Sequence, residues 1–234
     1  MNKSHVIELL EENQNPRGME NWSKVKNTAG LKSYGIGLTQ LRKLAKTIGR
    51  NRELSLELWE SDIYDAKIIA LLIDDPKQIT KEQAEKQVDE LTSGFLAHVF
   101  SSCDATLAKS PIAFDLANEW LATDNELRRQ SGYGLLYELS KNKRNKSLTD
   151  DYFMGCIESI NEKIFNLKES SSMRCAMGCA LMGIGKRNKP LNQRAVEVAQ
   201  AVGPIDFNED GGKCDPFDVL KHLTNDSLKK KLGV

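Results

Sequence analysis

Apolar residues recur three or four positions apart along most of the chain, and alternation with a period of two is almost absent. The stretch that contains Leu41, Leu44 and Ile48 is typical, because these residues would share one face of a helix. Runs of Val, Ile and Thr, which favour strands, are also missing. The pattern predicts an all-α fold. The one exception is a possible short β-hairpin near residues 204–214, where an Asp-Gly-Gly turn signal occurs.

The predicted helices form pairs along the chain. A first helix is capped by Ser4, and the others lie at residues 20–27, 39–48, 53–59, 63–73, 81–91, 95–108, 111–121, 125–139, 150–165, 172–186, 190–202 and 216–232. Helix pairs that recur about every 35–45 residues are typical of HEAT-like repeats, in which each pair buries its apolar face against its neighbours. We therefore predict an α-solenoid of HEAT-like helical pairs over residues 1–234, as a single domain. Trp59 and Trp120 are predicted to pack between repeats, and glycines inside helices, such as Gly183, predict close helix–helix approach.

The charge of the chain is zero overall but unevenly distributed. Residues 1–50 hold nine Lys and Arg against four Asp and Glu, residues 51–126 hold six against sixteen, and residues 127–234 hold eighteen against thirteen. Zero net charge argues against a protein that is basic all over, as many nucleic-acid binders are. An acidic middle between basic ends still allows one positively charged face.

The five cysteines stand at irregular spacing, which is typical of reduced thiols rather than of a disulfide framework. Cys175 and Cys179 lie four residues apart on a predicted helix, but no histidine lies near them, so we interpret them as small core residues rather than metal ligands. Residues 1–13 lack the apolar run of a signal peptide, and no stretch is long and apolar enough to span a membrane. We expect a soluble, cytoplasmic protein.

The first candidate for chemistry is Asp104, which would share a face of the predicted helix 95–108 with Phe100. Small residues and an apolar stripe border that face, which places the carboxylate at the edge of a concavity. Arg128 and Arg129 fall in the first turns of a later helix, ahead of Gly132. The alternative interpretation is a structural ion pair between repeats.

Four stretches together resemble the DNA alkylation repair family, the HEAT-like-repeat DNA glycosylases of the AlkD type. They are residues 100–104 (FSSCD), 120–129 (WLATDNELRR), 176–181 (AMGCAL), and 184–186 (IGK) running into Pro190, Leu191 and Ala195. The resemblance extends from about Tyr34 to Leu223. It implies a concave basic face that binds duplex DNA, and removal of cationic N3- or N7-alkylpurines by hydrolysis of the N-glycosidic bond, with no metal or cofactor.

The resemblance also implies roles for individual residues. Asp104 matches the family's catalytic carboxylate, and Arg129 best matches its arginine, although an ungapped comparison gives Gln130. Phe100 and Cys179 stand where the family has site tryptophans that pack against the damaged nucleotide. These departures are typical of a divergent branch, in which DNA binding persists without excision.

The retained groups fit the implied chemistry. A cationic alkylpurine is already a good leaving group, so a fixed carboxylate at Asp104 would stabilise the oxocarbenium-like sugar in the transition state and could orient the attacking water. Arg129 would hold a backbone phosphate through its planar fork. Further DNA contacts are predicted for Phe100 and for a set of basic residues: Arg128, Lys141, Lys143, Arg144, Arg174, Lys186 and Arg187.

Three functions follow from the sequence. The first is a DNA alkylation repair protein with glycosylase activity, the second a HEAT-repeat protein that binds DNA structures without catalysis, and the third a solenoid scaffold for other proteins. The expected partner is double-stranded or distorted DNA, without a membrane, metal or cofactor, and the expected state is a monomer.

Overall fold

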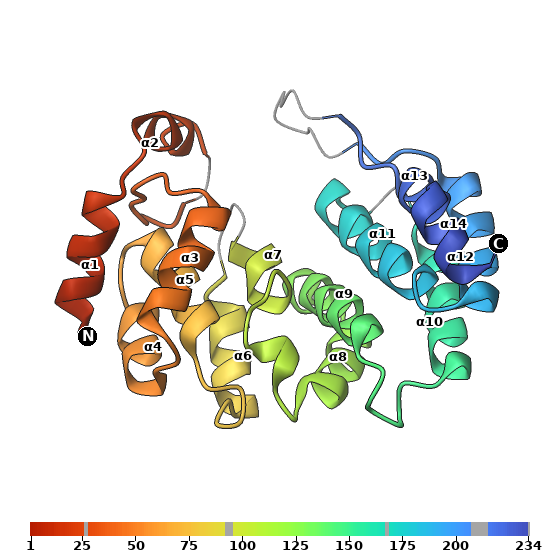
Figure 1. The fold of residues 1–234 in the computed structure, drawn as a ribbon, viewed down its shortest axis with the longest axis horizontal. Helices are drawn as coiled ribbons and strands as arrows, with labels where there is room; N and C mark the ends of the chain where they lie inside the picture. The colour runs from red at the N-terminus through yellow and green to blue at the C-terminus, as the bar shows by residue number, and fades with distance from the viewer. Residues whose placement is uncertain (26–27, 92–95, 167–168, 207–214, 234) are drawn as a thin grey trace. The chain divides into compact units, whose positions relative to one another are not determined.

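The computed structural model describes residues 1–234 apart from 26–27, 92–95, 167–168, 207–214 and 234 (Figure 1). The described residues are mainly helical, and the all-α prediction is confirmed. The chain divides into two compact units, Met1–Leu116 and Ala117–Val234, and each is described by itself.

The first unit is built around α5 (Tyr64–Ile73), which is buried along most of its length. It packs against α1 (Lys3–Glu12), α3 (Leu38–Ile48), α4 (Arg52–Trp59) and α7 (Leu96–Ser101). The other helical segments of this unit are α2 (Pro16–Trp22), α6 (Lys81–Asp89), the 3₁₀ turn η1 (Leu107–Lys109) and the start of α8 (Ala113–Leu121). Side-chain oxygens of Asn51 and Thr80 cap α4 and α6, as polar residues ahead of an apolar periodic run should.

A buried carboxylate ties the segment before α3 to the core of the first unit. Asp65 on α5 is fully buried, and it accepts hydrogen bonds from Ser33 Oγ (2.7 Å), Tyr34 N (2.8 Å) and Ile36 N (3.0 Å). Three donors satisfy the charge that burial would otherwise leave unsolvated. The segment that leads into α3 is thereby fixed against α5.

The second unit contains the rest of α8 and two long helices, α9 (Glu126–Lys141) and α11 (Ser171–Gly185), which pack against each other (Figure 1). The other helices are α10 (Asp150–Lys163), α12 (Lys189–Val202), α13 (Val219–Leu223) and α14 (Asp226–Leu232). A Cβ atom on Gly183 would lie 2.5 Å from Ser140 Oγ and 2.7 Å from Tyr137 Cδ2. The glycine therefore permits the close approach of α9 and α11 that the sequence predicts.

Several predicted helices differ from those in the structure. The first is capped by Asn2 and not by Ser4, and the one predicted at 20–27 is α2, Pro16–Trp22. The segment 216–232 forms two short helices, α13 and α14, instead of one. The predicted helix 95–108 ends at Ser101, and Cys103 and Asp104 adopt left-handed backbone conformations with φ of 54° and 73°. Thr106 explains the break, because its N–H (3.0 Å) and hydroxyl (3.1 Å) both donate to the Leu71 carbonyl of α5.

The predicted hairpin near residues 204–214 falls largely outside the described residues. Beside that gap, Ile205 and Phe217 form an antiparallel bridge with N···O distances of 2.9 and 2.8 Å. Trp59 and Trp120 are both buried, as predicted for packing residues.

Candidate nucleic-acid interface

Asp104 lies in the first unit, on the loop that follows α7. Because the helix ends at Ser101, Asp104 and Phe100 do not share a helical face, and the predicted face is corrected. The Asp104 side chain is 67% exposed, and its Oδ2 atom lies 3.1 Å from Arg42 Nε. An ion pair this exposed contributes little to stability and can rearrange when a ligand binds. The carboxylate is therefore accessible, on a loop that Thr106 fixes to α5.

The neighbourhood of Asp104 contains two residues to which the sequence assigned no role, Arg42 and His98. Burial by itself would raise the pKa of the adjacent Cys103 thiol, but hydrogen bonds with His98 and Ser102 and the charge of Arg42 bring that pKa below its usual value. Arg42 lies on α3, more than sixty positions earlier in the chain, so no local spacing could have indicated it. The site around Asp104 therefore contains positive charge as well as the carboxylate.

Phe100 is a core residue, which corrects its predicted contact with a nucleotide. Its ring is fully buried, with its centroid 6.5 Å from that of Trp59. Trp59 is held in turn by a hydrogen bond from its Nε1 to Glu90 (2.6 Å) and by the Lys67 ammonium, 4.5 Å from the ring centroid. These aromatic rings stabilise the first unit from inside and do not form a surface for a nucleoside.

Arg129 lies in the second unit and forms an ion pair with Glu169. Its Nη1 and Nη2 atoms donate to the two carboxylate oxygens at 2.8 and 2.9 Å, and the side chains are only 21% and 10% exposed. The ion-pair partners that the structure gives to the two predicted residues are thus Arg42 for Asp104 and Glu169 for Arg129. Glu169 precedes the α11 cap Ser170 and lies forty positions from Arg129. Arg129 thus contributes to the packing of α9 and α11 before any ligand arrives.

The guanidinium of Arg187 is also occupied by contacts within the protein. Its guanidinium donates to the carbonyls of Ser140, Asn142 (3.1 Å) and Leu148 (3.3 Å) and lies 4.2 Å from the Phe153 ring centroid. Burial lowers the pKa of this guanidinium. The residue satisfies carbonyls at the end of α9 that the helix leaves unpaired.

The other predicted basic residues lie on α9, on the connection after it, on α11 and directly after α11. Lys143 and Arg144 are exposed on the connection between α9 and α10. Lys141 interacts with Glu138 (2.8 Å), and burial together with the charge of Lys141 lowers the pKa of Lys186. We call Lys141, Lys143, Arg144 and Lys186 the basic cluster. Arg128 on α9 and Arg174 on α11 are partly exposed, and Arg174 Nε is buried without a hydrogen-bond acceptor among the described residues.

A cavity of about 520 Å³ lies in the second unit between α8, α9 and α10, and Tyr133, Tyr152 and Cys156 contribute to its lining. Burial raises the pKa of Tyr133 to about 12 and that of Cys156 to about 11, and it also raises the pKa of Tyr152. All three groups are therefore neutral near pH 7. The charged groups of the lining are Asp151 and Lys163, and the three neutral groups supply neither a phenolate nor a thiolate.

The described residues show neither a metal site nor a membrane span. No three His, Cys, Asp or Glu side chains in that part of the chain are grouped so that they could hold a metal ion. None of the helices there is long and apolar enough to cross a membrane.

Comparison with known proteins gives a family and a fold. The family model described as DNA alkylation repair enzyme matches residues 6–205. Two uncharacterized proteins, from Listeria innocua and Listeria monocytogenes, are each 24% identical over 202 residues, which cover 82% of this chain and 83% of theirs. A solved structure is described as representing a new family of proteins related to the HEAT-like repeat DNA glycosylases with affinity for branched DNA structures. It matches with a TM-score of 0.83 at 24% identity over 100% of this chain and 97% of that one, which confirms the HEAT-like fold.

Proposed function

Because the chain belongs to the DNA alkylation repair enzyme family, we propose that it binds double-stranded or distorted DNA through basic side chains of α9, α11 and the connection after α9. The basic cluster is the observation that carries the proposal. Four cations gather there, and only Lys141 has a carboxylate partner, Glu138, among the described residues. Such a cluster attracts the phosphate backbone without reading its sequence. The affinity for branched DNA of the protein with the similar fold supports the same conclusion.

The remaining predicted contacts divide into proposed phosphate contacts and residues that position helices. Arg128 and Arg174 lie on α9 and α11 and belong to the proposed phosphate contacts. Arg129 and Arg187 act instead by positioning those helices, since their guanidinium groups are committed to Glu169 and to main-chain carbonyls. Phe100 has no place in the interface, because it is buried.

The binding proposal is tested with a fluorescently labelled four-way junction and a duplex of the same sequence, titrated at several salt concentrations. Wild-type affinity should fall steeply as salt increases, because bound phosphates release counterions. The variant K143Q/R144Q should have a salt slope smaller by about one unit for each phosphate that it no longer neutralises. The variant K229Q/K230Q removes the same charge from α14 and serves as the control. If the wild-type protein binds neither DNA at about 50 mM salt, the proposal fails and a scaffold for proteins takes its place.

Excision of cationic alkylpurines is a second candidate function, favoured by the accessible Asp104 carboxylate. Beside the sugar of a bound lesion, that carboxylate would stabilise positive charge at the anomeric carbon while the purine leaves with the bonding electron pair. Water then adds to the carbon and loses a proton. Neither of the two positions that match the family's site tryptophans supplies a stacking ring, since Phe100 is buried and residue 179 is cysteine.

Release of 7-methylguanine or 3-methyladenine from methylated duplex DNA tests this activity. We expect the rate to fall about a hundredfold or more in Asp104→Asn, because that variant loses the charge and keeps the shape. DNA affinity should not change, since the carboxylate contributes to the transition state and not to phosphate binding. The absence of any release at high protein concentration would remove the excision proposal and leave DNA binding intact.

A further inference from the structure

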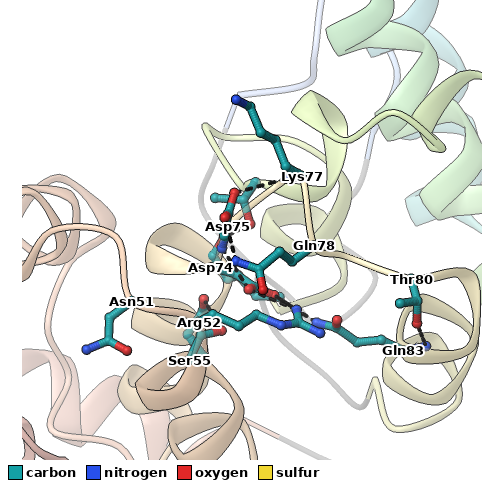
Figure 2. A network of polar contacts seen from close by, with 12 residues as sticks. Asn51, Arg52, Ser55, Asp74, Asp75, Lys77, Gln78, Thr80 and Gln83 are labelled. Carbon is teal, nitrogen blue, oxygen red and sulfur yellow. Dashed lines mark hydrogen bonds and ion pairs between the residues drawn. The ribbon is translucent and has the colours of Figure 1, made fainter.

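The first unit contains a positively charged cavity of about 510 Å³ that the proposed interface does not include. It lies between two chain connections, one from α3 to α4 and the other from α5 to α6 (Figure 2). Two hydrogen bonds join these segments: Asn51 N donates to the carbonyl of Ile73, the last residue of α5 (2.9 Å), and the Arg50 side chain donates from Nη1 to the Asp74 carbonyl (3.4 Å). The residues that line the cavity include Arg50, Asn51, Arg52, Asp75, Lys77 and Gln78.

A buried carboxylate behind the cavity holds Arg52 in place. The Asp74 side chain is 4% exposed, and its two oxygens each lie 2.9 Å from Arg52 Nη1. Asp74 also accepts hydrogen bonds from Gln83 Nε2 (2.8 Å) and from Asp75 N (2.7 Å), as Figure 2 shows in part. Arg52 is therefore ordered before a ligand binds, which reduces the entropy that binding would cost.

Three cations and one carboxylate line the cavity, and because Arg52 is paired with Asp74, the excess of positive charge comes from Arg50 and Lys77. The one carboxylate, Asp75, is directed to its own loop, because it accepts hydrogen bonds from Lys77 N (3.0 Å) and Gln78 Nε2 (2.7 Å). The hydrogen bonds from Gln78 and Lys77, together with the charges of Arg50 and Lys77, lower the pKa of Asp75, so it stays ionised and acceptor-only. Neither Arg50 nor Lys77 forms an ion pair within the described part of the chain, and both are exposed.

The N-terminus of α4 adds to the positive potential. The Asn51 side chain caps Leu54 N (3.0 Å), and the N–H groups of Arg52 and Glu53 have no acceptor within the helix. The first turn of a helix carries a partial positive charge that favours anions. Two exposed cations, one arginine paired with Asp74 and a helix N-terminus thus line the same cavity.

We propose that this cavity is a phosphate-binding site that receives a backbone phosphate of DNA held by the protein. The inference rests on the proposed function, because its ligand is the same class of nucleic acid. The volume accommodates a phosphodiester together with part of its sugar. Arg50 and Lys77 supply the charge, and Arg52 fixes the position.

The test compares R50Q/K77Q with the wild-type protein in titrations of the labelled four-way junction and duplex. Arg52 is left intact, since its removal would leave Asp74 buried without a partner. For each phosphate that the variant no longer neutralises, binding should weaken about eightfold at about 0.1 M salt and the salt slope should fall by about one unit. The matched control is K3Q/K86Q, which removes two cations near Glu60 in the same unit. Far-ultraviolet circular dichroism and urea midpoints confirm that both variants fold.

The outcomes separate this site from the proposed function. If the wild-type protein binds DNA and R50Q/K77Q binds it with the same affinity and salt slope, the cavity is not a DNA contact and the inference is wrong. Titration of the wild-type protein and of R50Q/K77Q with AMP is a second test. If AMP binds to the wild-type protein and not to R50Q/K77Q, while DNA affinity is equal in both, the site is for a free nucleotide and the inference is again overturned.

Discussion

The packing of α9 against α11 at Gly183 gives a stability prediction that local propensity would get wrong. Replacing glycine by alanine inside a helix usually stabilises it by about 1 kcal/mol. At Gly183 the new methyl group would lie 2.5 Å from Ser140 Oγ and 2.7 Å from Tyr137 Cδ2, where real Cβ atoms are not found. Ser140 Oγ already donates to the Tyr137 carbonyl (2.6 Å), so it cannot move without losing that bond.

Overpacking of a close contact costs about 1–3 kcal/mol, and this exceeds the gain in helix propensity. We therefore expect Gly183→Ala to lower the free energy of unfolding by about 1–2 kcal/mol. Gly155 is the matched control, because it lies inside α10 and a methyl group there would meet no atom within 4 Å. Gly155→Ala should raise the free energy of unfolding by up to about 1 kcal/mol.

Urea denaturation followed by circular dichroism measures both effects on the full chain. The two variants should shift the midpoint in opposite directions. Equal stabilisation by both would refute the argument, because it would show that α9 and α11 have room for a side chain at Gly183. DNA binding gives a second measurement, since the contact at Gly183 sets the spacing of the helices that carry Lys141 and Lys186.

Three further predictions concern single side chains. Glu169→Gln should lower the free energy of unfolding by about 2–3 kcal/mol, because Arg129 would stay largely buried without its counter-charge, and a Glu169→Gln midpoint equal to wild type would contradict this. Asp65→Asn should cost a similar amount in the same urea experiment, since one amide oxygen cannot replace a carboxylate that accepts three hydrogen bonds. Cys103 should react with iodoacetamide faster than Cys156 at pH 8, because the pKa of Cys103 is below the usual value whereas that of Cys156 is about 11. Peptide mass spectrometry measures both rates. The reaction rate of Cys103 should rise with pH and reach its plateau at a lower pH than that of an ordinary thiol.

The helices could be predicted because the signals for them are local. Apolar residues at helical spacing and caps such as Thr80 lie within a few positions of the turns they control, although the cap of the first helix is Asn2 and not the predicted Ser4. The end of α7 could not be predicted in the same way. Residues 101–106 contain neither glycine nor proline, and the helix stops because Thr106 bonds to Leu71, thirty-five positions earlier.

The candidate site was predictable only in part, for a similar reason. Sequence pattern identified Asp104 and Arg129 as unusual, but their partners Arg42 and Glu169 lie far along the chain, and no spacing rule connects them. Phe100 could be aligned with a site residue, yet whether a ring faces the core or the surface depends on where its helix ends. The proposed phosphate site joins two loops that the sequence gives no reason to pair.

The contact of Arg187 with the end of α9 has a consequence for how the second unit opens. The carbonyls of Ser140 and Asn142 accept hydrogen bonds from the side chain of Arg187, which lies about forty-five residues later in the chain. The last turn of α9 therefore cannot complete its hydrogen bonds until α11 has docked, and it cannot fray alone once docking has occurred. Amide hydrogen exchange in that turn should therefore occur when α11 opens and not through local fluctuation. The start of the connection between α9 and α10 is thus ordered by Arg187, a residue distant in the sequence.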